Sequence, residues 1–356
     1  MLKIHLKVSK YKKRTIISLL IAPLVVAIVS WFTMMRGYNQ PDGFFWDESY
    51  HIASAQKYLN YIFFMEPHPP LGKLLIAAGE ALFDANLDDS LFIDTSQAKD
   101  PPKELNLTGY RFFPALLGWL SATLFYFILL LITNNSLLSL GISSFYIFDN
   151  AIIVHNRGAM LEGIQIFFAL ATLLSSLMIE KVKKFQFISC AIAGIFFACT
   201  INTKVNGFIF IIPTFFCIWR STAKNWLSFF KLSLCTIIFS VAISILIWGI
   251  TFSFSYKINP KLENNGYFTA KKDLIEILKT DPPASFSIQV LYMLLRDSYT
   301  FFNKYERGVP KLNVCKESEN GSYPLLWPLG SSSINYRSNT SGNDQQYLYL
   351  IPNPII

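Results

Sequence analysis

Residues 46–73 read WDESYHIASAQKYLNYIFFMEPHPPLGK, and the interpretation of the whole chain starts from this stretch. Two adjacent carboxylates, Asp47 and Glu48, come first, and apolar residues then recur at helical spacing from Ile52 to Phe63. The pattern predicts an amphipathic helix of about three to four turns. The helix dipole favours negative charge at such an end, so the pair alone is equally well explained as an ordinary helix start. The stretch follows directly on an apolar run, which favours a functional role.

The composition is typical of a membrane protein. The 356 residues are 52% apolar and 15% charged, whereas an ordinary soluble domain has about 25% charged residues. The apolar residues gather in runs of about 20, the length that crosses a bilayer. Positions 1–14 hold six basic residues and no acidic one, which predicts a cytoplasmic anchor. We therefore attribute the net charge of +8 to the membrane surface and expect no nucleic-acid partner.

The chain is expected to cross the bilayer about seven times. The predicted spans are 15–35, 112–132, 137–154, 159–179, 185–201, Lys204 to Trp219, and 232–252. A tight turn is expected at 155–158, and a short helix at 71–83 after Pro69-Pro70. The predicted fold is thus an all-α polytopic membrane protein. Residues 1–252 form its transmembrane region, 36–110 an external loop with helices, and 253–356 an external segment.

Alternation of the spans places several cations on the non-cytoplasmic face. With a cytoplasmic N-terminus, two of the three later cytoplasmic links carry Lys and Arg clusters, as the positive-inside rule requires. Arg111, Arg157 and Lys204 then lie at the opposite ends of spans, against that rule. Snorkelling explains any one of them alone. All three share a face with the remaining polar candidates, which are Asp47, His68 and Lys73, and this indicates a shared anion.

A lipid-linked phosphate is the anion found beside a bilayer surface. Lys73 lies near the start of the helix after the Pro pair, where free N–H groups favour phosphate and a Lys adds a point charge. This chemistry suits a glycosyl donor carried on a polyprenyl phosphate. The five cysteines show no metal-ligand spacing, so no metal site is predicted.

Sugar transfer from such a donor needs a base and several cations. An acceptor hydroxyl needs a base within hydrogen-bond reach, and Asp47 is the candidate. The leaving phosphate needs cations, with Arg111 and Lys73 first, followed by Lys204 and Arg157. Glu48 is expected to orient the acceptor or sugar, or to pair with one of these cations. His68 either hydrogen-bonds sugar or phosphate or fixes its loop.

Several motifs, in this order, resemble the protein O-mannosyltransferase family. They are Asp47-Glu48, Tyr50-His51, residues 68–73 (HPPLGK), residues 110–118 (YRFFPALLG), Asp149-Asn150 followed by Arg157, and residues 203–207 (TKVNG). In the tail, residues 327–329, 334–336 and Asn353-Pro354 resemble a later external segment of the family.

This resemblance implies a GT-C membrane glycosyltransferase. Such an enzyme transfers mannose from polyprenyl-phosphate or dolichyl-phosphate mannose to Ser or Thr of a protein, with inversion, and the aspartate matched by Asp47 is its base. Glu162 stands where the family usually has an Asp, and Pro352 stands where it usually has a Gly. The family continues with further membrane helices, so the chain is expected to be truncated and to have little activity by itself.

Three other interpretations stay open. One is a related transferase that acts on a lipid or glycan acceptor, and another is a non-enzymatic transporter, although no two-half symmetry is visible. The third is a structural or partner-binding membrane subunit, which would not need Asp47 together with phosphate-binding cations on one face. The expected partners are the lipid-linked donor, a Ser/Thr-containing protein and the bilayer, with no cofactor and no implied divalent metal. A multi-pass location in a bacterial inner membrane is favoured, or in the endoplasmic reticulum membrane for a eukaryotic chain.

Overall fold

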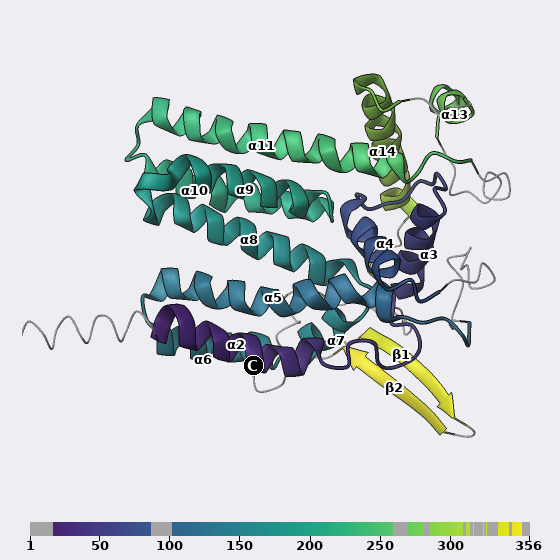
Figure 1. Cartoon of the computed structure of the whole chain (residues 1–356), viewed down its shortest axis with the longest axis horizontal. Coiled ribbons are helices and arrows are strands. Elements are labelled where there is room, and N and C mark those ends of the chain that lie inside the picture. The colour runs from purple at the N-terminus through teal and green to yellow at the C-terminus, as the bar shows by residue number, and fades with distance from the viewer. Residues whose placement is uncertain are drawn as a thin grey trace, which may run out of the picture.

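Long apolar helices lie side by side, and short helices with a β-hairpin gather at one end of them (Figure 1). This computed structural model describes residues 17–86, 102–258, 270–280, 285–308, 334–341 and 344–350, with 311–313, 316, 323 and 325 between them. The basic N-terminal cluster and the tail motifs at 327–329 and 353–354 lie outside the described residues.

Five helices in the described part of the chain are long and apolar enough to cross a membrane. They are residues 18–35 (η1 Ile17–Ile21, α2 Ala22–Ser30 and η2 Trp31–Met35), α5 (Thr108–Thr133), α8 (Leu161–Lys181), residues 183–201 (η4 Lys183–Phe185 and α9 Gln186–Ile201) and α11 (Trp226–Ser253). A bent pair of helices makes a sixth candidate. Two of the seven predicted spans depart from a straight helix of full length.

The first departure is the bent pair, α6 (Ser136–Ile147) and α7 (Asn150–Arg157), whose axes differ by 61°. The chain breaks here because the Asp149 carboxylate caps α7, accepting a hydrogen bond of 2.8 Å from the backbone N–H of Ile152. Residues 155–157 are consequently the last turn of a helix, and the predicted tight turn at 155–158 is wrong.

The second departure is the apolar stretch after Lys204. It begins as a 3₁₀ helix, η5 (Val205–Phe210), and continues as α10 (Ile211–Ser221). Together they have 17 residues, whereas a span needs about 20. Each of the seven predicted spans thus has a helical counterpart, but only five or six meet the length of a full crossing.

Glycines allow two of the helix pairs to approach closely. A Cβ at Gly79 would lie 2.3 Å from the carbonyl oxygen of Gly109, and one at Gly194 would lie 2.3 Å from that of Thr236. Both distances are shorter than a real Cβ contact. Glycine is therefore required where α4 (Leu71–Phe83) meets α5 and where α9 meets α11.

The short elements form what we call the cap, at the end of the bundle where α2 finishes and α5 begins (Figure 1). The cap consists of α3 (Glu48–Leu59), α4, α13 (Lys272–Leu278), α14 (Ile288–Gly308), β1 (Ile334–Ser341) and β2 (Asp344–Leu350). The predicted helix 71–83 is confirmed at both ends. The helix predicted from Asp47 ends at Leu59, so Ile62 and Phe63 lie beyond it. The antiparallel hairpin was not predicted.

The links after α5, α8 and α10 lie at the opposite end of the bundle from the cap (Figure 1). The last two links hold basic residues, namely Lys181, Lys183, Lys184, Arg220 and Lys224. The alternation expected from the sequence thus puts the cap and the basic links at different ends.

Thiol labelling tests this topology in membranes. In a chain without its native cysteines, Cys introduced at Glu104 or Lys279, both exposed at the cap end, should react with an impermeant reagent in intact cells. Cys introduced at Lys184, exposed on the link after α8, should react only after the membrane is opened. The reverse pattern would place the cap in the cytoplasm and contradict the topology.

Candidate active site

A fully buried ion pair joins the start of α3 to the start of α5. Arg111 donates through Nε to Oε1 of Glu48 and through Nη2 to Oε2, both at 2.7 Å, and neither side chain is exposed. Glu48 also accepts hydrogen bonds from the backbone N–H groups of Phe45 at 2.9 Å and Ala159 at 2.7 Å. The carboxylate is therefore saturated, as a buried charge must be if it is to be tolerated.

The remaining donors of Arg111 hold the loop that leads to α3. They bond the carbonyl oxygens of Asn39 at 3.0 Å, Pro41 at 2.8 Å and Gly43 at 2.6 Å. Since a guanidinium has five N–H donors, Arg111 has none left for a ligand. The geometry gives Arg111 a role in holding this loop, whereas the sequence predicted that it binds the donor phosphate, and that role stays a prediction. For Glu48 the geometry favours the pairing role, which was one of its alternatives.

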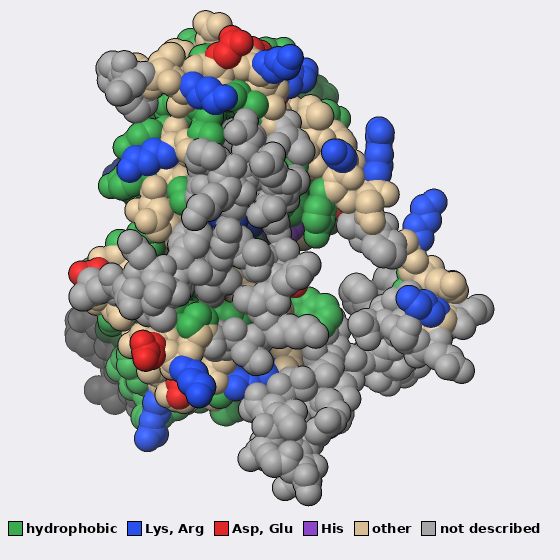
Figure 2. Space-filling model, turned by 90° about the vertical axis from the view of Figure 1, so that its right-hand side faces the viewer, with side chains coloured by type: hydrophobic (Ala, Val, Ile, Leu, Met, Phe, Trp, Pro, Cys, Tyr) green, Lys and Arg blue, Asp and Glu red, His purple; other side chains and the backbone are tan. Residues whose placement is uncertain are grey.

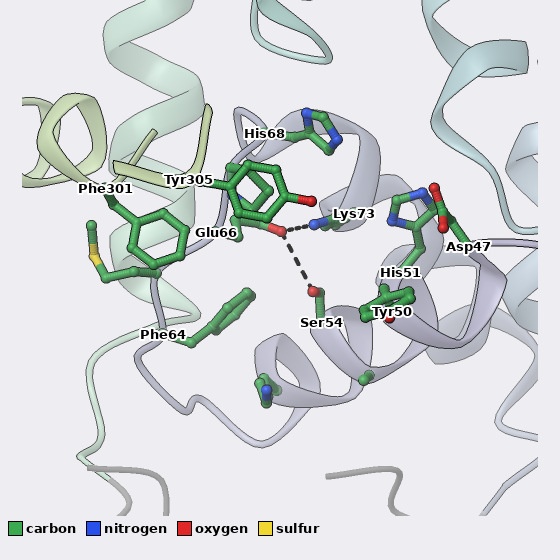
Figure 3. A pocket seen from close by; sticks show the side chains of 14 residues that line it. Asp47, Tyr50, His51, Ser54, Phe64, Glu66, His68, Lys73, Phe301 and Tyr305 are labelled. Carbon is green, nitrogen blue, oxygen red and sulfur yellow. Dashed lines mark hydrogen bonds and ion pairs between the residues drawn. The ribbon is translucent and has the colours of Figure 1, made fainter. Parts of the chain in front are cut away.

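A cavity of about 540 Å³ begins at Asp47, the residue before Glu48. It lies between α3, residues 64–68, the start of α4 and α14. It is lined by Asp47, Tyr50, His51, Ala53, Ser54, Lys57, Phe64, Met65, Glu66, Pro67, His68, Lys73, Phe301 and Tyr305. Asp47 and His51 lie together at one end, while Phe64 and Phe301 lie at the other (Figure 3). The cavity thus has a polar end and an aromatic end, with Glu66 and Lys73 between them.

Asp47 lines the cavity with a carboxylate that is available to a substrate. It occupies the N-cap position of α3, but its side chain makes no capping hydrogen bond. The residue is exposed through the cavity, yet the surrounding protein partly desolvates the carboxylate and raises its pKa. Glu162 raises the pKa of Asp47 further, while Lys204, His155 and Lys73 lower it. A carboxylate with a raised pKa is a better proton acceptor near neutral pH.

Lys73 contacts the Glu66 carboxylate and is 3% exposed. Glu66 also accepts hydrogen bonds from Ser54 at 3.4 Å and Tyr58 at 3.3 Å. Burial lowers the pKa of Lys73, with Lys57 and Lys204 acting in the same direction, whereas contact with a carboxylate favours the charged form. Lys73 is therefore a cation that already has a partner inside the cavity wall.

Two histidines face each other across the cavity, with the rings of His51 and His68 centred 6.5 Å apart. Burial lowers the pKa of His51 well below its ordinary value, and burial together with Lys204 lowers the pKa of His68 to about 4. Both rings are thus neutral near pH 7. They can donate and accept hydrogen bonds to a sugar without adding charge.

A second polar cluster adjoins Asp47. Glu162, in the first turn of α8, contacts the ammonium group of Lys204, and its Oε2 lies 2.9 Å from Nε2 of His155. The phenol oxygen of Tyr336 lies 2.8 Å from Nδ1 of the same histidine. The charges of Glu162, Lys204 and His155 all act on the pKa of Asp47, so this cluster and the cavity form one electrostatic unit.

Arg157 lies apart from the cavity. Its guanidinium donates to the carbonyl oxygens of Arg36, at 3.0 Å, and Gly37 at the end of the first span. On the described part of the cap face, other Lys and Arg side chains are scattered around the outer edge (Figure 2). Of the predicted cations other than Arg111, Lys73 lines the cavity and Lys204 adjoins it, whereas Arg157 lies at the end of the first span.

The eight site residues predicted from the sequence fall into three groups. Asp47, His68 and Lys73 line the cavity, Glu162 and Lys204 adjoin it, and the other three hold the backbone, namely Glu48, Arg111 and Arg157. Sequence reasoning missed Glu66, His51, His155 and Tyr336. His51 and Tyr336 lay within quoted motifs and Glu66 within the opening stretch, but no signal marked His155 beyond its place beside Arg157.

The sequence profile described as dolichyl-phosphate-mannose-protein mannosyltransferase matches residues 24–258. The chain belongs to this family. It is 29% identical over 189 residues to protein O-mannosyl-transferase 1 of Danio rerio, covering 52% of this chain and 26% of that protein. It is 23% identical over 206 residues to dolichyl-phosphate-mannose--protein mannosyltransferase 6 of Saccharomyces cerevisiae, covering 56% and 27%. The chain thus spans about a quarter of the length of these relatives.

A solved structure shares the fold. The S. cerevisiae protein O-mannosyltransferase Pmt1-Pmt2 complex bound to the sugar donor aligns with a TM-score of 0.60 and 20% identity, over 71% of this chain and 37% of that one. The predicted family and the predicted GT-C class of multi-pass membrane protein are confirmed. The individual site residues, the metal requirement and the membrane in which the chain resides stay predictions.

Loss of the buried Arg111–Glu48 pair should lower the stability of the chain. Arg111→Met leaves Glu48 charged, buried and unpaired, which should destabilise the chain by about 3–5 kcal/mol. Arg220→Met is the matched control, because Arg220 pairs with Glu180 at 3.1 Å while 57% exposed, and such pairs contribute about 0–1 kcal/mol. Thermal unfolding in detergent compares the two. Equal, small losses would show that Arg111 does not hold the loop.

Proposed function

We propose that this chain transfers mannose from a polyprenyl-phosphate or dolichyl-phosphate donor to Ser or Thr hydroxyls of a protein. The observation that carries the proposal is the Asp47 carboxylate, which makes no capping hydrogen bond and lines a cavity at one end of the apolar helices, with Lys73 and Lys204 nearby. Family membership supports the donor and the reaction. The names of the relatives, protein O-mannosyl-transferases, support the protein acceptor.

In the proposed reaction the acceptor oxygen attacks C1 of the mannose while Asp47 takes its proton. The bond between C1 and the phosphate oxygen breaks, and its electron pair leaves with the lipid phosphate. A phosphodiester monoanion thereby becomes a phosphate monoester that carries one more negative charge. Displacement at C1 inverts the anomeric centre. The site must therefore supply one proton acceptor and cations that stabilise a growing charge.

Lys204 is the better placed of the two available cations for that charge. Its side chain is 21% exposed, compared with 4% for Lys73. Its partner Glu162 divides its two oxygens between Lys204 and His155, whereas Glu66 contacts Lys73 at the cavity wall. We therefore assign the phosphate contact to Lys204 first, with Lys73 second, in place of the order expected from the sequence. His51 and His68 hydrogen-bond the sugar hydroxyls.

Replacement of the base tests the chemistry. In the full-length enzyme, Asp47→Asn keeps the shape and removes the proton acceptor, so transfer should fall by about 10² to 10⁴ while donor affinity changes little. Asp42→Asn is the control, since Asp42 is exposed on the same loop and does not line the cavity. Transfer to a Ser/Thr peptide is measured with a defined donor. Normal turnover by Asp47→Asn would refute the assignment.

Substitution of two charged neighbours of Asp47 should shift the pH profile of sugar transfer in opposite directions. The base must be ionised, so the rate falls as the pH drops through the raised pKa of Asp47. Glu162 raises that pKa, so Glu162→Gln should move the acid limb to lower pH. Lys204 lowers it, so Lys204→Gln should move the acid limb to higher pH. Shifts of the same sign, or none, would show that Asp47 does not set the limb.

A further inference from the structure

Tyr336 joins the hairpin to the loop that ends at Asp47. Its ring is 2% exposed and stacks on Phe45 with the centroids 5.3 Å apart. Its carbonyl oxygen accepts a hydrogen bond of 3.0 Å from the N–H of Trp46. The next residue, Arg337, donates to the carbonyl oxygens of Gly43 and Asp42 at 3.1 and 2.8 Å. Four contacts thus attach the hairpin to residues 42–46, which directly precede Asp47.

The hydroxyl of Tyr336 contacts a histidine whose other nitrogen faces a carboxylate. Nδ1 of His155 lies 2.8 Å from the phenol oxygen, and Nε2 lies 2.9 Å from Oε2 of Glu162. The 2.9 Å distance from Nε2 to the Glu162 carboxylate fits an ion pair in which Nε2 carries a proton, because an ionised carboxylate has none to give. Nδ1 then accepts from the tyrosine when the ring is neutral, and donates to it when the ring is charged. The hydroxyl holds the ring in both states.

This row of contacts ends at Lys204, the residue proposed to bind the donor phosphate. The other oxygen of Glu162 contacts Lys204, so Tyr336, His155, Glu162 and Lys204 form a continuous chain. The four groups come from β1, α7, α8 and the residue before η5, and Asp47 is electrostatically coupled to all of them. A displaced His155 would free Glu162 to turn, and Lys204 would lose its fixed position.

We propose that Tyr336 is a positioning residue of the transferase site, which orients His155 through its hydroxyl and thereby fixes Glu162 and Lys204 beside Asp47. The inference rests on the proposed function. It extends the site beyond residues 24–258, the part of the chain that matches the family profile, to the hairpin.

The contact itself is tested without any turnover. The 356-residue chain has four histidines, so selective ¹⁵N-histidine labelling is practical, and His155→Asn assigns the ring. Tyr336→Phe keeps the stacking on Phe45 and removes the hydroxyl. It should shift the Nδ1 resonance of His155, whereas Tyr299→Phe, on an exposed face of α14, should not. Unchanged His155 resonances in Tyr336→Phe would overturn the proposal.

The role of the contact is tested by a double-mutant cycle in the full-length enzyme. Tyr336→Phe should lower transfer by about 3- to 10-fold, the effect of one lost hydrogen bond. The double variant Tyr336→Phe/His155→Asn should be as slow as His155→Asn alone, because both changes break the same chain. Additive losses would give Tyr336 a merely structural role and overturn the inference. An inactive parent enzyme would instead refute the proposed function, and the resonance shift would still decide the contact.

Discussion

The Arg111–Glu48 pair is the interaction on which the site depends. Both charges are buried, and an isolated charge in such a place would be strongly destabilising. Here the five N–H donors of Arg111 bond the Glu48 carboxylate and three backbone carbonyl groups, and Glu48 also accepts from the backbone. The pair draws together the loop after the first span, the start of α3, the start of α5 and the backbone before α8. Because Glu48 is fixed by its buried contacts with Arg111 and the backbone, the preceding residue, Asp47, is directed to the cavity.

The two adjacent carboxylates therefore have opposite environments and opposite roles. Glu48 is saturated with donors, whereas Asp47 is partly desolvated and left without a capping bond. The two lysines have similar environments, because a carboxylate holds each ammonium group in place. Glu66 is the partner of Lys73, and Glu162 is the partner of Lys204. A site organised in this way offers a proton acceptor together with prearranged cations.

Local pattern was sufficient for most of the helices, but it missed the hairpin and the bend before α7, and it was insufficient for the contact partners. The Pro pair and the apolar run predicted α4 at 71–83 correctly, because proline sets the first turn of a helix. Asp47, His68 and Lys73 were predicted to share a site because the expected alternation of the spans puts them on one face with cations of other spans. Arg111 was predicted to contact a phosphate, but its N–H donors bond Glu48 and the carbonyl groups at 39–43, and sequence spacing does not show these partners. Tyr336 reaches His155 across 181 residues, and spacing cannot show such a contact.

Asp47 is proposed as the base and Glu48 as a structural partner, and chemical rescue separates these two roles most directly. Asp47→Ala opens a space in the exposed cavity wall, so added formate should restore part of the lost transfer to a Ser/Thr peptide in the full-length enzyme. Glu48→Ala removes the partner of a buried Arg111, so formate should restore nothing there. Rescue of Glu48→Ala, with none for Asp47→Ala, would contradict the account.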